Sequence, residues 1–310
     1  MNSSQDNATN RDNPLISVIT ICWNAAGVIG RTLESVTSQT YPDFEYIVVD
    51  GGSKDGTREL VESYNGRISA FVSEKDRGIA DAMNKGVRLS RGELIIHMHA
   101  GDTFHDSDVL SRIADDYRQN GWEWGFGGQV LCDAGGRVLE IQHPQTFHYR
   151  LLRIRNYVPH QAAVLTRKIF EQFGPFDISY RILMDYRFWL ALGKDVQPRI
   201  FPFMVARFEC GGTSYSDYVS SYREAQRARR EVPWGAFPWR LREKLSTWLW
   251  HPTMLKMIQF VCPKRLRRRL RCLIEPDNPT PVVVNLPKTK TAAGRPRVNE
   301  SGIYSHRVGS

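Results

Sequence analysis

The stretch FEYIVVDGGSKDGT, residues 44–57, decides the fold. Its first half is a run of aromatic and β-branched residues that predicts a buried strand over 44–49. Its second half is a glycine-rich turn, after which a helix is expected from Thr57 to about Tyr64. The glycines let the backbone turn sharply and approach a ligand, although the same turn could serve only to cap the helix. A strand that leads through such a turn into a helix predicts an α/β protein.

The same alternation continues on both sides of this stretch. Further strands are predicted over 16–21, 69–72 and 94–98, and further helices over 27–39, 79–92 and 107–120. Repeated strand–helix–strand units of this length are right-handed and place their strands side by side. We therefore expect a mostly parallel sheet flanked by helices, with a Rossmann-like nucleotide-binding half.

Four polar loops follow the predicted strands. In such a sheet, ligands bind beyond the carboxyl ends of the strands, so the four loops should converge on one edge. The carboxylate of Asp50 could accept hydrogen bonds from a nucleobase or a ribose there. Neither a G-x-G-x-x-G fingerprint nor a P-loop accompanies the pattern. The loops cover residues 22–24, 50–53, 74–77 and 99–102.

The later part of the chain has a less regular pattern. Strands are predicted near 129–131 and 163–165, and a short helix over 186–192, opened by Asp185 and closed by Gly193. We expect four regions along the chain. These are a disordered tail over 1–14, an α/β domain over 15–216, a helical basic segment over 217–275 and a disordered tail over 276–310.

Cysteine usage and hydropathy limit the compartment. The five cysteines are odd in number and scattered, which indicates neither a disulfide framework nor a thiolate zinc site. The first residues lack the apolar core of a signal peptide, and no later segment has the roughly 18 apolar residues of a spanning helix. We therefore expect a cytoplasmic protein that neither enters the secretory route nor spans a membrane.

The positive charge is concentrated in one segment. Between Trp239 and Cys272 there are ten Lys or Arg and one acidic residue, which accounts for the net charge of +9 of the whole chain. Trp239, Trp248 and Trp250 lie among these cations, and aromatic rings beside cations on amphipathic helices are typical of segments that bind an anionic membrane surface. The alternative is a helical cap that packs on the domain with a solvated basic face. No nucleic acid partner is expected, because no recognised nucleic-acid-binding fold accompanies the charge.

The stretch HMHAGD, residues 97–102, resembles a histidine metal site at first sight. A β-lactamase-like zinc hydrolase would need H-x-H-x-D-H, but this chain has Gly101 and Asp102 at the last two positions. The register is therefore wrong by one residue, and a zinc hydrolase is disfavoured.

Several motifs together resemble the family-2 glycosyltransferases of GT-A fold, above all the bacterial branch that builds capsule, exopolysaccharide and lipopolysaccharide. The likeness covers residues 15 to about 195 and is most specific in the first 105. The motifs that carry it, in chain order, are ISVITICWN (16–24), LESVTSQTYPDFEYIVVDGGSKDGT (33–57), SEKDRGIADAMNKGVRLSRGELI (73–95), HAGDTF (99–104), HQAAV (160–164), FGPFD (173–177) and LMDYRFWLAL (183–192).

The resemblance implies a nucleotide-sugar donor, one divalent cation and transfer with inversion at the anomeric carbon. UDP is the default nucleotide and GDP the alternative, and the cation would be Mg²⁺ or Mn²⁺. By position, the nucleoside would be held by Asn24, Asp50 and Asp76, with Arg77 on a phosphate. Residues that could face the donor sugar or the acceptor are Asp81, Asn84, Lys85, His160 and Gln161.

The resemblance also implies a metal ligand and a catalytic base. Asp102 stands at the acidic metal motif and Asp185 at the base, although an aspartate at a helix start is also a natural N-cap. His99 stands where the family usually has Asp or Asn. It could join the metal, contact phosphate or shape the loop, and an imidazole ligand would favour Mn²⁺.

The reading that follows is an inverting glycosyltransferase at the cytoplasmic face of the cell membrane. It would add a sugar to a lipid-linked glycan acceptor in bacterial surface polysaccharide synthesis. One alternative is a non-catalytic nucleotide-sugar-binding homologue whose acidic motif has weakened. A second is a Rossmann-type oxidoreductase, which shares the strand–helix pattern but should carry the glycine fingerprint that is absent here.

Overall fold

A computed structural model describes residues 13–210 and 217–232. The predictions for 1–12 and for 233–310, including the basic segment, lie outside these residues. The described strands are β1 (Ile16–Cys22), β2 (Phe44–Asp50), β3 (Ala70–Ser73), β4 (Leu94–His97), β5 (Thr103–Phe104), β6 (Trp124–Cys132), β7 (Val138–Gln142), β8 (Ala163–Thr166) and β9 (Arg199–Glu209). The described helices are α1 (Ile29–Thr37), α2 (Thr57–Glu62), α3 (Ile79–Leu89), α4 (Val109–Asn120), α5 (Tyr149–Leu152), α6 (Arg167–Phe173), α7 (Met184–Leu192) and α9 (Tyr218–Glu231), with a 3₁₀ turn η1 (His160–Ala162).

All described strands belong to one sheet in the order β3-β2-β1-β4-β8-β6-β9-β5, with β7 paired to β6. The expected parallel arrangement is confirmed for β3, β2, β1 and β4. Beyond β4 the sheet is mixed, because β8 runs antiparallel to both β4 and β6 while β6 and β9 are parallel. "Mostly parallel" therefore describes the half made by residues 16–97 and needs correction for the other half.

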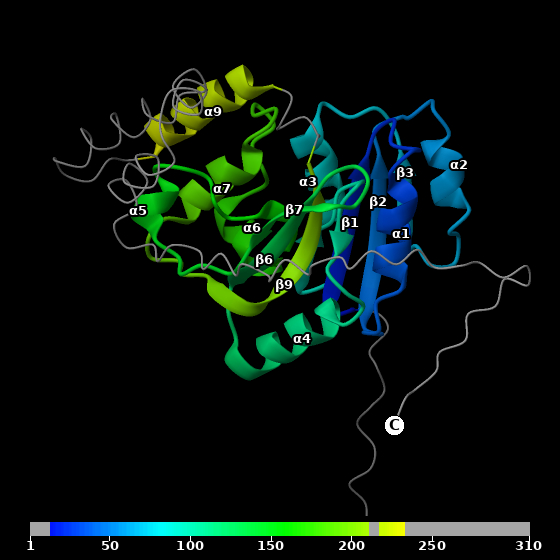
Figure 1. Ribbon diagram of the computed structural model, residues 1–310, viewed down its shortest axis with the longest axis horizontal. Coiled ribbons are helices and arrows are strands. Elements are labelled where there is room, and N and C mark those ends of the chain that lie inside the picture. Colours follow the sequence, from blue (N-terminus) through cyan, green and yellow to red (C-terminus); the bar gives the residue numbers. More distant parts are fainter. Residues whose placement is uncertain (1–12, 211–216, 233–310) are drawn as a thin grey trace, which may run out of the picture.

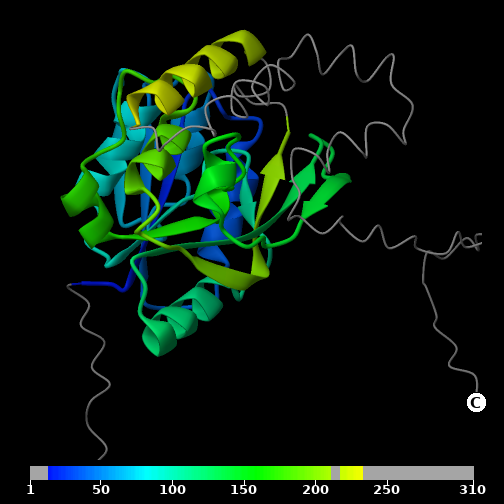
Figure 2. The same cartoon turned by 90° about the vertical axis from the view of Figure 1, so that its left-hand side faces the viewer.

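Helices cover both faces of the sheet (Figure 1). Successive side chains of a strand point to opposite faces, so Ile16 and Val18 pack with α1, α2 and α4, whereas Ile19 and Ile21 pack with α3, α6 and α7. α9 lies against α7 through the buried Ala228. Figure 1 and Figure 2 show α4 and α9 at opposite ends of the molecule.

Two local features differ from the sequence expectation. The glycine-rich run at 121–128 is largely part of β6 and not a loop. Its glycines allow the neighbouring strand β9 to come close, since a Cβ at Gly127 would lie 2.7 Å from the carbonyl oxygen of Phe203. Helix α7 begins at Met184 after Leu183 at the N-cap position, so Asp185 lies in the first turn and does not cap the helix. Asp185 is therefore available for a role other than capping.

Candidate active site

The first part of the site surrounds Gly51, at the carboxyl ends of β1 and β2. A Cβ at Gly51 would lie 2.6 Å from a carboxylate oxygen of Asp76 and 3.3 Å from Cδ1 of Trp23. The indole of Trp23 is 67% exposed, which is unusual for a tryptophan and leaves a ring face open to solvent. An exposed aromatic side chain and a carboxylate therefore both lie close to the Gly51 backbone, an arrangement that suits a planar base.

Asn24 fixes the neighbouring loop. Its φ of 46° lies in the left-handed region, which asparagine tolerates better than most residues. Its side-chain oxygen accepts a hydrogen bond from the backbone N–H of Lys54 at 3.0 Å, and its own N–H donates to Ser53 at 2.7 Å. Asn24 therefore ties the end of β1 to the turn after β2.

Asp50 is the most internal of the predicted nucleoside residues. Its carboxylate is fully buried and accepts hydrogen bonds from the Ser73 hydroxyl at 2.6 Å and from the N–H of Ser53 at 3.0 Å. Burial by itself would raise its pKa, but the hydrogen bonds outweigh burial and hold the pKa below the usual value. Asp50 thus orders the loop as an anion, and a nucleoside contact would have to replace one of these internal bonds.

At the start of α3, a cation faces the open side. The guanidinium of Arg77 is 72% exposed and lies 3.2 Å from the carboxylate of Asp81. Lys85 points back along the helix, 2.8 Å from Glu74 and 3.8 Å from Asp81. Asp81 is buried, which would raise its pKa, but the hydrogen bonds and charge of Arg77 hold the pKa below the usual value. Asp81 therefore orients Arg77 and Lys85.

Asn84 has a structural position. Its amide donates to the carbonyl of Phe176 at 2.8 Å and accepts from the N–H of the same residue at 2.9 Å. The side chain is 4% exposed, so both ends of the amide are occupied inside the protein. The expected contact of Asn84 with the donor is not supported by this geometry, because the amide is fully used in joining α3 to Phe176.

Three histidines gather beneath the site. The ring centroids of His97 and His160 are 5.3 Å apart, those of His99 and His160 are 5.1 Å apart, and Phe176 packs against His97 and His160. Burial lowers the pKa of His97 to about 3 and that of His99 to about 4, and it holds the pKa of His160 well below the ordinary value. All three rings are therefore neutral near pH 7.

Gln161 belongs to a chain of amides. It donates to Gln129 on β6 at 2.8 Å, and Gln129 donates to Gln142 on β7 at 2.6 Å. Gln161 thus connects η1 to the hairpin of β6 and β7. The predicted pair of His160 and Gln161 splits, with the imidazole in the histidine cluster and the amide in this chain.

Asp102 lies at the start of β5 among polar groups from other elements. Its Oδ1 accepts the N–H of Glu209 at 3.3 Å, and the side chains of Glu209 and Arg31 form an ion pair beside it. Burial raises the pKa of Asp102 well above its usual value, and the charge of Arg31 opposes this only in part. Asp102 is therefore a buried carboxyl group with one cation and one further carboxylate nearby.

Two carboxylates at this position could take part in binding a divalent cation. Asp102 and Glu209 supply hard oxygen ligands of the kind that Mg²⁺ and Mn²⁺ prefer. Within residues 13–210 and 217–232, no three His, Cys, Asp or Glu side chains are arranged to hold a metal ion. The residues therefore fit a cation that is shared with a diphosphate and do not form a metal site by themselves.

Asp185 lies on the first turn of α7, one helical turn before Trp189, whose ring lies 6.2 Å from that of His160. Residues four apart share a helix face, so Asp185 is on the side of the histidine cluster. Its Oδ2 accepts a hydrogen bond from Asn156 at 3.2 Å, and its Oδ1 is buried without a partner. Burial raises the pKa of Asp185 to about 6. This value suits a general base at neutral pH.

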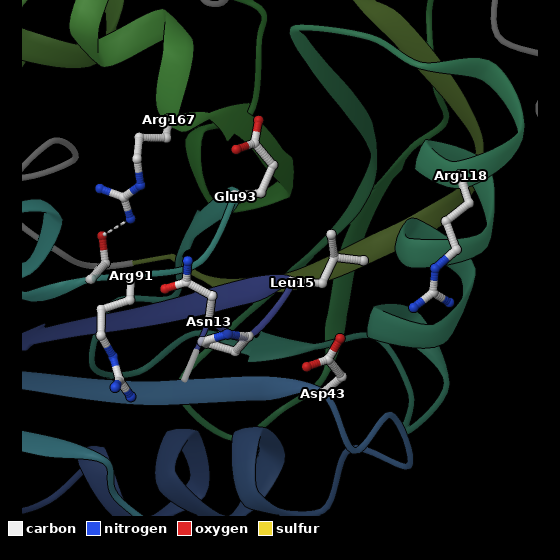
Figure 3. Close-up of a pocket in the computed structure, with 9 residues that line it drawn as sticks. Asn13, Leu15, Asp43, Arg91, Glu93, Arg118 and Arg167 are labelled. Carbon is white, nitrogen blue, oxygen red and sulfur yellow. Dashed lines mark hydrogen bonds between the residues drawn. The ribbon is translucent and has the colours of Figure 1, made fainter. Parts of the chain in front are cut away.

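A separate cavity of about 580 Å³ lies at the opposite edge of the sheet (Figure 3). It is lined by residues that precede β1, β2 and β4, among them Leu15, Asp43 and Glu93, and by Arg118 and Arg167. None of the predicted site residues lines it. Among the described helices, none combines the length and apolar content needed to cross a bilayer.

Comparison with known proteins shows the family and the fold of the chain. Residues 17–172 match the family model described as glycosyl transferase family 2. The chain is 30% identical over 178 residues to a PGL/p-HBAD biosynthesis glycosyltransferase of Mycobacterium bovis, covering 56% of this chain and 68% of the relative. Two solved structures share the fold. They are S. aureus TarS in complex with UDP-GlcNAc (TM-score 0.58, 15% identity, 81% and 77% of the two chains) and the mannosyltransferase PcManGT of Pyrobaculum calidifontis with GDP-Man and Mn²⁺ (TM-score 0.54, 18% identity, 85% and 82%).

Three residues of the site were missed by sequence reasoning. Trp23 carried a usable signal, since an aromatic residue directly after a buried strand stands at the edge where ligands bind. Asn156 and Glu209 carried none, because each reaches the site from an element far away in the chain. Separation along the chain also explains why the sequence did not reveal the internal hydrogen bonds of Asn84, whose partner Phe176 lies 92 residues further on.

Proposed function

Because the chain belongs to glycosyl transferase family 2, we propose that it transfers a sugar from a nucleotide-diphosphate donor to a hydroxyl group with inversion at the anomeric carbon. The observation that carries the proposal is the meeting of Trp23 and Asp76 over Gly51 at the carboxyl ends of the strands. This surface offers a ring face for stacking, and polar atoms of Asn24 and Asp76 for the base and ribose. Arg77 is an exposed cation directly after Asp76 in the chain and would meet a phosphate.

Asp185 supplies the chemistry at the acceptor in this proposal. Its ionised Oδ1 accepts the proton of the acceptor hydroxyl while that oxygen attacks the anomeric carbon from the face opposite the diphosphate. The bond between the anomeric carbon and the phosphate oxygen breaks, and the nucleoside diphosphate leaves with the electron pair. A carboxylate without a second partner on Oδ1 is ready for such a contact.

A divalent cation fits the proposal as a partner of the diphosphate. When bound, Mg²⁺ or Mn²⁺ would neutralise the charge that develops on the leaving group. Asp102 would hold it, with Glu209 as the second oxygen ligand from the protein. The imidazole of His99 is neutral near pH 7, because burial lowers its pKa, and a neutral imidazole can bind a metal. A role of His99 as a further ligand stays a proposal.

Our proposals for the acceptor and for the location of the protein are supported only by its sequence and its relatives. The name of the relative, a PGL/p-HBAD biosynthesis glycosyltransferase, supports a role in bacterial glycan biosynthesis. The aromatic and basic residues of 239–272 support docking on an anionic membrane surface. We therefore propose a lipid-linked acceptor reached from the cytoplasmic face of the membrane.

The test combines donor binding with transfer. Thermal shifts with UDP-, GDP- and dTDP-sugars, with and without Mn²⁺, should identify one donor, because a ligand of the native state raises its stability by mass action. Release of the nucleoside diphosphate from that donor is then measured for Asp185→Asn. We expect unchanged donor binding and a rate lowered by about 100-fold or more. Near-normal turnover of Asp185→Asn would contradict the role of Asp185 as the base.

The buried state of Asp102 favours one alternative enough to be tested in parallel. A carboxyl group whose pKa is raised binds a cation less readily, as expected for a homologue that binds the donor without transferring it. Donor turnover that needs Mn²⁺ or Mg²⁺ and is lost in Asp102→Ala would rule this alternative out. Donor binding without any turnover would support it.

A further inference from the structure

The side chain and helix turn of Asp185 are held by residues from two distant parts of the chain. Asn156, in the segment between α5 and η1, donates its amide hydrogen to Oδ2 of Asp185 at 3.2 Å. Glu224, on α9, accepts the backbone N–H groups of Arg181, Ile182 and Leu183 at 2.8, 3.0 and 2.8 Å. These are the last residues before α7, so the carboxylate of Glu224 occupies the amino end of the helix that carries Asp185.

The two contacts act on Asp185 in opposite directions. A hydrogen bond from an amide stabilises the ionised carboxylate more than the protonated one. Glu224 brings a negative charge to the helix end whose dipole would otherwise favour an anion, and this charge disfavours the ionised form of Asp185. The Oδ1 atoms of Asp185 and Asn156 are both buried. Burial raises the pKa of Asp185 and the backbone N–H of Tyr186 lowers it, each more strongly than Asn156 or Glu224, so these two residues adjust a balance that the surroundings of Asp185 set.

We propose that Asn156 and Glu224 are an opposed pair of positioning residues, of which Asn156 orients Asp185 and favours its ionised form, while Glu224 anchors the start of α7 and opposes ionisation. The inference rests on the proposed function, in which Asp185 is the catalytic base. It adds that two residues outside the motifs shared with the family move the pH range of the reaction in opposite directions.

The ionisation of Asp185 can be followed without any substrate. The pKa of Asp185 in the folded protein lies near 6, above the value of about 3.9 in an unfolded chain. Its contribution to stability is therefore complete below about pH 3.9 and is lost as the pH rises through 6. The Asp185→Asn protein does not lose stability in this way, because it has no ionisable side chain at this position. The difference in melting temperature between a protein and its Asp185→Asn counterpart should grow with pH between these two pKa values, so its midpoint lies halfway between them and moves by half of any change in the folded-state pKa of Asp185.

The experiment compares four full-length proteins, each with its Asp185→Asn counterpart. We expect a midpoint at about pH 5 for the unmodified chain, about half a pH unit higher in Asn156→Ala, which loses the hydrogen bond, and about a quarter of a unit lower in Glu224→Gln, which loses the charge. Glu224→Gln keeps a carbonyl oxygen for the N–H groups before α7. The matched control is Glu171→Gln, an exposed acid on α6, which should leave the midpoint unchanged.

The same proteins give the rate profile for the donor chosen by the binding panel, with water as acceptor. The acid limb of the rate should move with the stability midpoint, upward in Asn156→Ala and downward in Glu224→Gln. A purely structural role would lower melting temperatures without moving either midpoint, and this result would overturn the inference. Stability midpoints that move in the two expected directions while the rate profile stays fixed would instead remove Asp185 as the base, which is a failure of the proposed function.

Discussion

At the scale of single residues, the side chains that matter are those whose exposure contradicts their type. Trp23 is an exposed aromatic residue, Asp102 is a buried carboxyl group, and Asp185 is a half-buried residue whose Oδ1 atom is buried. Burial raises the pKa of both carboxyl groups. The sequence placed Asn24, Asp50, Asp76 and Asp102 correctly at the ends of their strands, because strand ends follow from the hydrophobic pattern. It could not predict how buried each carboxylate is, since burial depends on residues that are distant in the chain. Glu209, which contacts Asp102, lies 107 residues after it.

Trp23 provides the prediction at this scale. Trp23→Ala removes the ring face and should weaken binding of the nucleoside diphosphate roughly 5- to 150-fold, which corresponds to about 1–3 kcal/mol of stacking. Trp23→Phe keeps a ring and should recover most of the affinity. Dissociation constants for UDP and GDP from titration calorimetry measure the effect, with Val219→Ala as a control at an exposed apolar residue on α9. Equal affinity of Trp23→Ala and the unmodified chain would exclude stacking on this residue.

At the scale of elements, the half of the sheet formed by β1 to β4 is set by local pattern. The ends of β1, β2, α3 and β4 agree with the predicted ranges within about three residues, because each element is bounded by its own turn residues. The pairing of β8 between β4 and β6 could not be predicted, since antiparallel register there joins Leu94 to Thr166 across 72 residues. Long-range pairing of this kind leaves no periodic signal in either segment.

The contact of α3 with β1 yields the prediction at this scale. A Cβ at Gly86 would lie 2.3 Å from Cγ2 of the buried Ile19, so the helix can approach the strand only because residue 86 is glycine. Gly86→Ala gains about 1 kcal/mol of helix propensity but forces the helix and strand apart, and we expect a net loss of about 1–2 kcal/mol of unfolding free energy. Gly30→Ala in α1, where a Cβ would meet Leu60 at 3.7 Å, is the matched control and should be neutral or stabilising. Urea titrations measure the unfolding free energy of both variants. A Gly86→Ala protein that is more stable than the unmodified chain would show that α3 and β1 can shift to accommodate the added Cβ.

At the scale of the whole molecule, the excess positive charge of the chain is concentrated in the segment that follows the described residues. The ten cations between Trp239 and Cys272 are accompanied by three tryptophans, whereas the four cations at Lys288, Lys290, Arg295 and Arg297 have no aromatic neighbour within that run. If the first group binds a membrane, both charge and aromatic content should be needed, because cations meet anionic headgroups while rings enter the interface. The two groups of cations therefore form a built-in comparison.

This comparison gives the prediction for the full chain. Replacing Arg267, Arg268, Arg269 and Arg271 by Gln should weaken binding to vesicles with anionic lipid by at least about 100-fold, since each cation near such a surface contributes about 1 kcal/mol. Replacing Lys288, Lys290, Arg295 and Arg297 by Gln changes the net charge equally and should have a much smaller effect. Sedimentation with vesicles of anionic and of zwitterionic lipid, at low and at physiological salt, measures both. Equal losses for the two variants would mean that net charge alone drives the association, and no loss in the first variant would mean that the basic segment does not face the membrane.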